Sequence, residues 1–483
     1  MANSFLFYDI ETTGLNKAFD QVLQFAAIRT DQQLNEIGRH ELTVKLRPDV
    51  APSPAAVLTN RIPVTQFSDG LCEYEATEQI HRLMNQPGTI SLGYNTMGFD
   101  DEFLRFSFHR NLLPPYTHQY KNGCRRMDLF PMAILYRLYK KDVLIWPQID
   151  GKSSLKLEHL SSANRLVTGQ SHEAIVDVAA TVELARRFFK KEKMWQYLEG
   201  YFDKETDAYR MAQLPIGLKS ASGEHNRGLM VSGEYGPDQN YQIPVISIGT
   251  SIPYPNQTLW LRMDLPQLRD TTPESIGETT WVIRKRLGEP AILLPPHNRY
   301  WKKIGNDRNA IFDENLKWLQ ENHDCFQRIV KYHREFRYQF IPNLDPDASL
   351  YQIGFYSRVD EKLCQRFHRV SLKEKADIAL QFSSPEARTL AWRIICRNYP
   401  GAVSAKFDLE FKSYLQRINP LLDDDAMVDY REERRTTPTG VLIEIKLLKQ
   451  SEELTSHQIQ LLTELENYLY TKFRTQLPNI VSI

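Results

Sequence analysis

Three short runs rich in β-branched and aromatic residues open the chain, and they constrain its fold more than any other feature. The runs FLFYDIE, VLQFAAIRT and HELTVKLR lie between Ser4 and Arg47 and are separated by polar or glycine-containing turns. Runs of this composition and spacing are typical of strands joined by short connections. The sequence therefore predicts an antiparallel meander at the start of the chain.

Helical periodicity follows the meander. Apolar residues at helical spacing predict helices around Leu71–Met84, Asp100–Leu112, Met127–Tyr139 and Ile175–Lys191. The apolar run TISLGYN, which precedes the second of these helices, adds another strand to the sheet. Strands that come first and helices that later alternate with them indicate a mixed α/β domain, which we place at residues 1–193.

Two further domains are predicted beyond residue 193, in agreement with about 150 residues per domain for a chain of 483. The runs GLMVSGEYG, YQIPVISIG and TLWLRMDL alternate and are broken by turns, which indicates a small β-rich domain over residues 194–345. From about Leu350 the periodicity is helical, so residues 346–483 form a helical domain. The segment FIPNLDPDAS, with two prolines, is the predicted linker.

Charge and composition limit the classes of function. Sixty Lys plus Arg balance sixty Asp plus Glu, so any site for a polyanion must be a local patch. Five widely spaced cysteines lack the pairing of a zinc site, and they are interpreted as thiols in a reducing compartment. Neither a signal peptide nor a run of eighteen apolar residues occurs. We therefore expect a soluble cytoplasmic protein that does not bind membranes.

Two carboxylates stand at the end of the first strand-like run. Asp9 and Glu11 are two residues apart, so in a strand their side chains project from one face at a separation of about 7 Å. Such a pair needs a raised pKa, a basic partner or hard divalent cations such as Mg²⁺. The pair alone is weak evidence, because strand ends often carry acidic residues that simply face water.

Further polar residues follow at two other junctions. Asp100 comes where the strand TISLGYN passes through a loop into a helix, and His172 precedes a helix whose first turns contain Asp177. Loops on a rigid base often carry functional groups. Taken singly, Asp100 is better explained as a helix cap and His172 as a solvated loop residue.

Together these residues resemble the three ordered motifs of the DEDDh 3′–5′ exonucleases, a branch of the ribonuclease H-like superfamily. The motifs are Asp9-x-Glu11, Asn95-x-x-x-Phe99-Asp100 and His172-x-x-x-x-Asp177. The blocks FLFYDIETTG, QFAAIRTD, LGYNTMGFDDE, LKLEHL and HEAIVDVAAT narrow the resemblance to the bacterial exodeoxyribonuclease I family. VSGEYG and LYQIGFYS extend the resemblance beyond the nuclease domain.

The resemblance implies a fold and a catalytic site. The fold is a ribonuclease H-like exonuclease domain with a mixed sheet, followed by an SH3-like β domain and an α-helical C-terminal domain. Two Mg²⁺ ions, for which Mn²⁺ could substitute, would be bound by Asp9, Glu11, Asp100 and Asp177, whose four negative charges balance the ions. His172, with an ordinary pKa near 6.5, is assigned as the general base.

An exonuclease must also hold its strand. Aromatic faces stack on bases, and Lys and Arg contact phosphates. The resemblance implies that Arg105, Tyr116, Tyr120 and Lys156 contact DNA, with Lys156 near the scissile nucleotide, and that Glu11 also contacts the substrate. Lys156 stands where the family has an arginine, and it keeps the charge without the bidentate geometry. Tyr120 stands where the family has a tryptophan.

Two other runs interleave basic and aromatic residues, namely Lys331–Tyr338 and Tyr300–Lys303. Each could line a groove for DNA. Each could also be an amphipathic segment with its cations in water and its aromatic rings in a core.

The implied activity is processive removal of 5′-mononucleotides from the 3′ end of single-stranded DNA, in repair and recombination. The implied enzyme is a monomer whose partner is the single-stranded-DNA-binding protein. One alternative is an RNA 3′-exonuclease of the same superfamily, because the catalytic residues alone do not select the sugar. A second alternative is a nucleic-acid-binding scaffold with a dead site, whose signature would be a missing carboxylate or histidine; all five motif residues are present.

Overall fold

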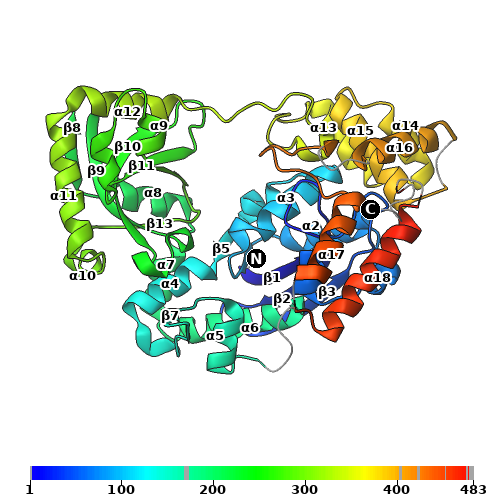
Figure 1. Cartoon of the computed structure of the whole chain (residues 1–483), viewed down its shortest axis with the longest axis horizontal. Helices are drawn as coiled ribbons and strands as arrows, with labels where there is room; N and C mark the ends of the chain where they lie inside the picture. Colours follow the sequence, from blue (N-terminus) through cyan, green and yellow to red (C-terminus); the bar gives the residue numbers. More distant parts are fainter. Residues whose placement is uncertain are drawn as a thin grey trace.

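The chain forms an N-terminal α/β part, a β-rich arm and a group of C-terminal helices (Figure 1). The computed structural model describes residues 3–167, 173–401, 405–420, 425–451, 453–474 and 477. Within these ranges no helix combines the length and apolarity that a membrane crossing requires.

The N-terminal part is built on a five-stranded sheet with the order β3-β2-β1-β4-β5. Its strands are β1 (Ser4–Thr12), β2 (Val22–Thr30), β3 (Glu36–Thr43), β4 (Thr89–Gly93) and β5 (Arg125–Asp128). The first three pair antiparallel, whereas β4 lies parallel to β1 and β5 parallel to β4. The predicted meander, the added strand and the mixed sheet are confirmed.

Two predicted boundaries in this part were wrong. The third strand lies earlier than HELTVKLR, because Val44 leaves β3 and forms an isolated bridge with Leu71. The predicted helix from Met127 begins instead at Leu129, and residues 125–128 form β5. The Asp128 carboxylate accepts a hydrogen bond from the Phe130 N–H and so fixes the start of the helix.

Helices cover both faces of the sheet. The helices of residues 54–212 are α1 (Pro54–Asn60), α2 (Glu73–Met84), α3 (Asp100–Arg110), α4 (Leu129–Tyr139), α5 (Leu157–Asn164), α6 (Ala174–Phe189), α7 (Glu192–Glu199) and α8 (Lys204–Ala212). Among them, α2 and α3 cover one face and α4 and α6 the other, whereas α8 lies with the middle part (Figure 1). Side chains of β1 alternate between two cores: Phe5 and Phe7 pack with residues of α4 and α6, and Leu6 and Tyr8 pack with residues of α2 and α3. This alternation directs Asp9 and Glu11 toward the face covered by α6.

The middle part is β-rich, as predicted. It contains β8 (Ile216–Ser220), β9 (Gly223–Val231), β10 (Gln242–Thr250), β11 (Gln257–Arg262), β12 (Val282–Arg286) and β13 (Ile292–Leu294). Helices α9 (Ile276–Thr279), α10 (Asn298–Trp301), α11 (Asn306–Glu321) and α12 (His323–Glu335) accompany them. In α10, Tyr300 is buried and Trp301 packs against the core, so the run from Tyr300 to Lys303 is an amphipathic segment.

The last part is helical, as predicted, with α13 (Arg358–Phe367), α14 (Leu372–Ala379), α15 (Pro385–Asn398), α16 (Ala405–Ile418), α17 (Pro438–Ser451) and α18 (Ser456–Lys472). A short hairpin, β6 (Gln148–Ile149) and β7 (Lys152–Ser153), belongs to the N-terminal part. Leu461 and Leu465 of α18 share a core with Val57 of α1, so the C-terminal helices pack directly on the N-terminal part.

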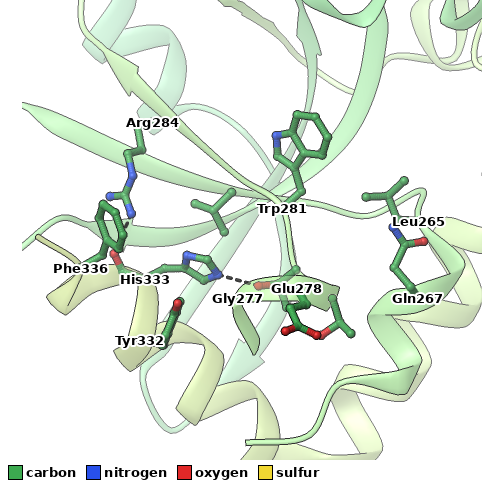
Figure 2. Close-up of a pocket in the computed structure, with 12 residues that line it drawn as sticks. Leu265, Gln267, Gly277, Glu278, Trp281, Arg284, Tyr332, His333 and Phe336 are labelled. Carbon is green, nitrogen blue, oxygen red and sulfur yellow. Dashed lines mark hydrogen bonds between the residues drawn. The ribbon is translucent and has the colours of Figure 1, made fainter. Parts of the chain in front are cut away.

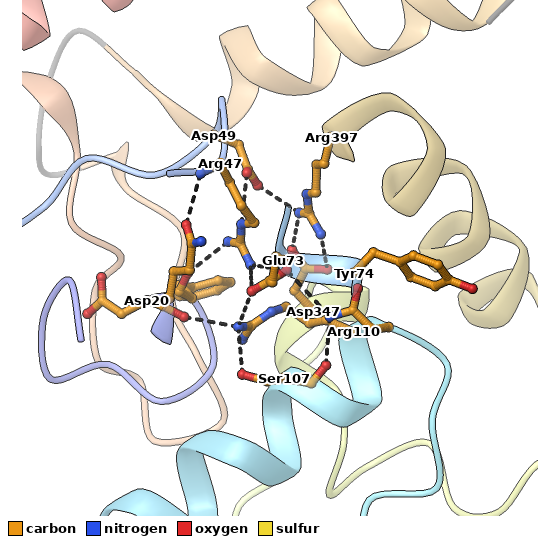
Figure 3. A network of polar contacts seen from close by, with 12 residues as sticks. Asp20, Arg47, Asp49, Glu73, Tyr74, Ser107, Arg110, Asp347 and Arg397 are labelled. Carbon is orange, nitrogen blue, oxygen red and sulfur yellow. Dashed lines mark hydrogen bonds and ion pairs between the residues drawn. The ribbon is translucent and has the colours of Figure 1, made fainter. Parts of the chain in front are cut away.

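Buried ion pairs reinforce this contact (Figure 3). Arg47 pairs with Glu73 at 2.9 Å, and Arg397 of α15 pairs with Asp49 at 2.8 Å. Arg397 also pairs with Asp347, which lies in the predicted linker FIPNLDPDAS. The linker prediction was wrong for the second half of the segment, because Asp345 and Asp347 are buried in ion pairs with arginines of α15. The exposed connection runs instead from Glu335 to Phe340.

Candidate active site

Three carboxylates meet where β1 passes beneath the start of α6. Asp9 and Glu11 share one face of β1, and Asp177 lies in the first turn of α6. One carboxylate oxygen from each lies within 4.8 Å of the others. Strand periodicity sets Asp9 and Glu11 on one face of β1, and the packing of α6 against β1 brings Asp177 to them.

Burial and neighbouring negative charges disfavour ionisation of the Asp9 and Glu11 carboxyl groups. Burial, followed by the charges of Asp100 and Asp177, raises the pKa of Asp9 well above its ordinary value. Burial, followed by Asp9 and Asp177, raises the pKa of Glu11 to about 9. The carboxylates therefore lack the positive charge that would keep them ionised at neutral pH.

The donor set fits hard divalent cations. Each of the three side chains offers a carboxylate oxygen, which is the ligand that Mg²⁺ and Mn²⁺ take in proteins. The raised pKa values of Asp9 and Glu11 indicate that a nearby positive charge is needed to keep these groups ionised at neutral pH. Asp9, Glu11 and Asp177 could hold such an ion, with Asp100 beside them.

Asp100 begins α3, as its position between a strand and a helix predicted. Its Oδ1 accepts a hydrogen bond from the backbone N–H of Ile10 at 3.2 Å, which ties the start of α3 to the middle of the Asp9–Glu11 motif. The Asp100 pKa is raised well above its ordinary value, chiefly by burial and also by Asp128 and Glu11. Asp100 therefore adds to the same negative field.

Asp128 organises the loop that carries Asp100, and sequence reasoning missed it. Its Oδ1 accepts from the Asn95 N–H at 2.8 Å and its Oδ2 from the Met97 N–H at 3.0 Å. These bonds hold the turn between β4 and α3 while the same carboxylate caps α4. The only signal in the sequence is an acidic residue before an apolar helical run, which is the pattern of an N-cap.

Asp101, the neighbour of Asp100, is held by two arginines and a histidine. It is fully buried, and it accepts hydrogen bonds from His118 Nε2 at 2.8 Å, from Arg126 Nη1 at 2.5 Å and from Arg105 Nη2. Burial opposes ionisation, but Arg105 and Arg126 outweigh it and hold the Asp101 pKa well below its ordinary value. The second ion pair of Arg126, with Glu289, extends this network to the middle part.

The predicted DNA contacts differ in accessibility. Tyr120 is 63% exposed, and the Lys156 side chain is 73% exposed with its Nζ 3.7 Å from Glu158. Arg105 is buried and pairs with Asp101, with its guanidinium 5.9 Å from the ring of the partly buried Tyr116. Tyr120 and Lys156 are thus accessible to a ligand, whereas the Arg105 guanidinium is buried in its ion pair with Asp101. His172, the predicted general base, lies outside the described residues.

Comparisons with known proteins agree with this architecture. Residues 6–185 match the exonuclease family, and residues 344–472 match the exonuclease I C-terminal domain. Exodeoxyribonuclease I of Escherichia coli is 28% identical over 451 residues, which cover 89% of this chain and 92% of that protein.

Solved structures share the fold along nearly the whole chain. The crystal structure of E. coli exonuclease I in complex with a dA16 oligonucleotide superposes with a TM-score of 0.81 at 24% identity, covering 97% of this chain and 100% of that chain. The crystal structure of SSB/exonuclease I in complex with the inhibitor CFAM gives a TM-score of 0.81 at 24% identity, covering 98% and 100%.

The fold and the two matched domains define the chain as an exonuclease, a hydrolase of nucleic acids. Within that class it belongs to the exodeoxyribonuclease I family, as the C-terminal domain and the full-length similarity to the E. coli enzyme indicate. The resemblance stated from the sequence motifs is confirmed.

Proposed function

We propose that the chain hydrolyses single-stranded DNA from its 3′ end and releases 5′-mononucleotides. The observation that carries this proposal is the cluster of Asp9, Glu11 and Asp177, whose oxygens lie within 4.8 Å of one another in an exonuclease fold. Such a cluster suits phosphodiester hydrolysis, which needs positive charge beside an anionic substrate.

Each residue has a proposed role. Asp9, Glu11, Asp100 and Asp177 would hold two divalent ions, Mg²⁺ or Mn²⁺, and His172 would accept the proton of the attacking water. Bound divalent ions lower the pKa of water and stabilise charge on the phosphoryl oxygens and the departing 3′-oxygen. The N–H of Ile10 fixes the Asp100 carboxylate, and Asp128 holds the loop that precedes it, so the carboxylate need not reorganise during the reaction.

The substrate end would be held beside these carboxylates by exposed side chains of the N-terminal part. Tyr120 can stack on a base and Lys156 can contact a phosphate, because both are exposed. Tyr116, beside Arg105, offers a partly buried ring. Arg105 would mainly hold Tyr116 and Asp101 in position. Glu11 would also contact the terminal nucleotide.

DNA is favoured over RNA as the substrate by the relatives that match the whole chain, which are named exodeoxyribonucleases. The single-stranded form is supported by the solved complex of E. coli exonuclease I with single-stranded DNA. The SSB/exonuclease I structure supports a single-stranded-DNA-binding protein as the partner. The proposed process is DNA repair and recombination. The proposed enzyme is monomeric and cytoplasmic. Its three domains would meet near residues 193 and 345.

The test is digestion of a 5′-labelled oligonucleotide as single-stranded DNA, as the matching RNA and as blunt duplex, with Mg²⁺ or with EDTA. We expect metal-dependent shortening of single-stranded DNA alone, through a ladder of labelled products. Early release of labelled mononucleotide would instead mean digestion from the 5′ end. Preference for RNA would overturn the substrate, and cleavage in EDTA would overturn the role of the carboxylates.

A further inference from the structure

Lys156 stands at the end of a short segment that joins β7 to α5. We call residues 153–156 the Lys156 segment. Lys156 precedes the first residue of α5 in an extended conformation, with φ −65° and ψ 139°. Its side chain is 73% exposed and carries a compact charge on a flexible stem. The phosphate that its ammonium group can reach therefore depends on where the backbone of the segment is held.

The Tyr94 hydroxyl holds this backbone. It donates a hydrogen bond to the carbonyl oxygen of Leu155, the residue next to Lys156. Burial, followed by the charges of Asp128 and Tyr241, raises the pKa of Tyr94 well above its ordinary value, so the hydroxyl keeps its proton and acts as a donor. The Leu155 side chain is buried in a core shared with α4 and α6. Beside Lys156, the backbone is therefore fixed by both a hydrogen bond and an apolar contact.

Two other tyrosines show how hydroxyl groups differ in this chain. Tyr332 of α12 is 45% exposed and lines a pocket of about 380 Å³ on the middle part (Figure 2), where water can replace any partner of its hydroxyl. Tyr136 of α4 is fully buried and donates to the carbonyl oxygen of Phe188 at 2.8 Å. Tyr94 resembles Tyr136, because loss of either hydroxyl would leave a carbonyl oxygen inside the core without its donor.

Further contacts hold the other end of the Lys156 segment. Arg137 of α4 donates from Nε to Ser153 Oγ at 2.5 Å. Ser154 Oγ lies 2.7 Å from His159 Nδ1 of α5. These contacts join the segment to the helices on either side of it, whereas the Tyr94 hydrogen bond joins it to the end of β4.

Tyr94 also belongs to the turn that leads to Asp100. It directly follows β4, and the N–H of the next residue, Asn95, donates to Asp128 at 2.8 Å. The strand β4 is paired in parallel with β1, which carries two of the proposed metal ligands. A single turn, residues 94–99, therefore connects the proposed metal ligands with the backbone beside Lys156.

We propose that Tyr94 is a positioning residue that places Lys156 at the phosphate of the scissile nucleotide. The inference rests on the proposed function, in which Lys156 contacts a phosphate. A lysine lacks the bidentate geometry of the arginine that stands at this position in the family, so its contact depends more strongly on where the backbone is held. The Tyr94 hydroxyl would thus favour the reacting geometry through Lys156, without itself contacting the substrate.

The test is a double-mutant cycle in the full chain between Tyr94→Phe, which removes only the hydroxyl, and Lys156→Ala. Single-turnover cleavage of a 5′-labelled oligothymidylate with Mg²⁺ is the measurement. We expect Tyr94→Phe to slow cleavage about fivefold and Lys156→Ala about twentyfold. The double variant should be no slower than Lys156→Ala alone, because Tyr94 acts through that side chain. In a Lys156→Arg chain, Tyr94→Phe should cost only about twofold, since a bidentate donor tolerates a displaced backbone.

Tyr136→Phe is the matched control, because it removes the same kind of hydrogen bond from the same core. Both substitutions should lower the free energy of unfolding in urea by similar amounts, whereas Tyr94→Phe alone should slow cleavage. The Mg²⁺ concentration for half-maximal rate should not change in Tyr94→Phe. A rise in that concentration would mean that Tyr94 acts through Asp100 and would overturn the proposal.

Binding in EDTA gives a readout that does not depend on cleavage. Anisotropy of a fluorescent strand of about 6 nucleotides should show about threefold weaker binding by Tyr94→Phe, and no further loss when this change is added to Lys156→Ala. A chain that binds in this way but does not cleave single-stranded DNA would contradict the proposed function and still support the role of Tyr94. Equal losses from Tyr94→Phe with and without Lys156 would overturn that role, as would an equal loss of cleavage in Tyr136→Phe.

Discussion

The guanidinium of Arg126 lies 2.6 Å from the carboxylate of Glu289, measured from Nη2 to Oε1. This ion pair joins β5 to the turn between β12 and β13, and the same guanidinium holds Asp101, the neighbour of Asp100. Lys285 donates to the carbonyl oxygen of Glu289 at 2.9 Å and so fixes the turn. The placement of the middle part is thereby linked to the start of α3 in the N-terminal part.

Glu289→Gln should lower kcat on single-stranded DNA about three- to tenfold with little change in KM, because weakening a charged hydrogen bond costs about 1–2 kcal/mol and loosens the support of Asp100. The Mg²⁺ concentration for half-maximal rate should rise. Steady-state kinetics over a Mg²⁺ series measures both effects. Glu234→Gln, at an exposed position of the same part, serves as the control. A change confined to KM would assign Glu289 to DNA binding instead.

Asp177→Ala should abolish turnover, by more than about a hundredfold, because it removes one of the three clustered carboxylates. In EDTA, binding of single-stranded DNA should persist and become slightly tighter, since one negative charge near the phosphates is lost. Single-turnover cleavage and anisotropy measure the two properties. Activity equal to that of the unaltered chain would remove Asp177 from the site.

The carboxylate cluster was predicted from the resemblance of three motifs to the DEDDh exonucleases, and local rules account only for the placement of each residue on its own element. A period of two residues sets Asp9 and Glu11 on one face of a strand, and the start of a helix sets the position of Asp177. Asp128 could not be predicted in the same way. Its partners Asn95 and Met97 are 33 and 31 residues away, and only the pairing of β4 with β5 brings them together.

The types of the helices and strands could be predicted from the sequence, whereas the residues at which they begin and end were predicted less well. The strand β5 is only four residues long and continues directly into α4, so the helical pattern concealed it. The linker was misplaced because Asp345 and Asp347 look like turn residues in the sequence. Their burial depends on Arg393 and Arg397, which come about 50 residues later. Long-range ion pairs of this kind leave no local signal.

Asp128→Asn should lower kcat about 10- to 100-fold while KM changes little, since the substitution alters the support of a proposed metal ligand. The amide can still accept at Oδ1, but its NH₂ group would face a backbone N–H where Oδ2 now accepts from Met97. We expect the free energy of unfolding to fall by about 1–3 kcal/mol, measured by urea denaturation. Asp203→Asn, at another helix cap, should lose stability without the drop in kcat.

Docking of the C-terminal helices should be sensitive to acid through His109. This buried side chain of α3 donates from Nε2 to the Pro346 carbonyl at 2.8 Å, and burial lowers its pKa to about 4. The unfolded chain takes up the proton near pH 6.5, so stability is complete above that pH and falls as the pH drops toward 4, by up to about 1.4 kcal/mol per pH unit. His109→Gln, whose amide can donate to the same carbonyl, should lose less stability than the unaltered chain between pH 7 and pH 5 in urea denaturation. His297→Gln, at an exposed position, should keep the original pH dependence, and an identical dependence in all three chains would contradict the role of His109.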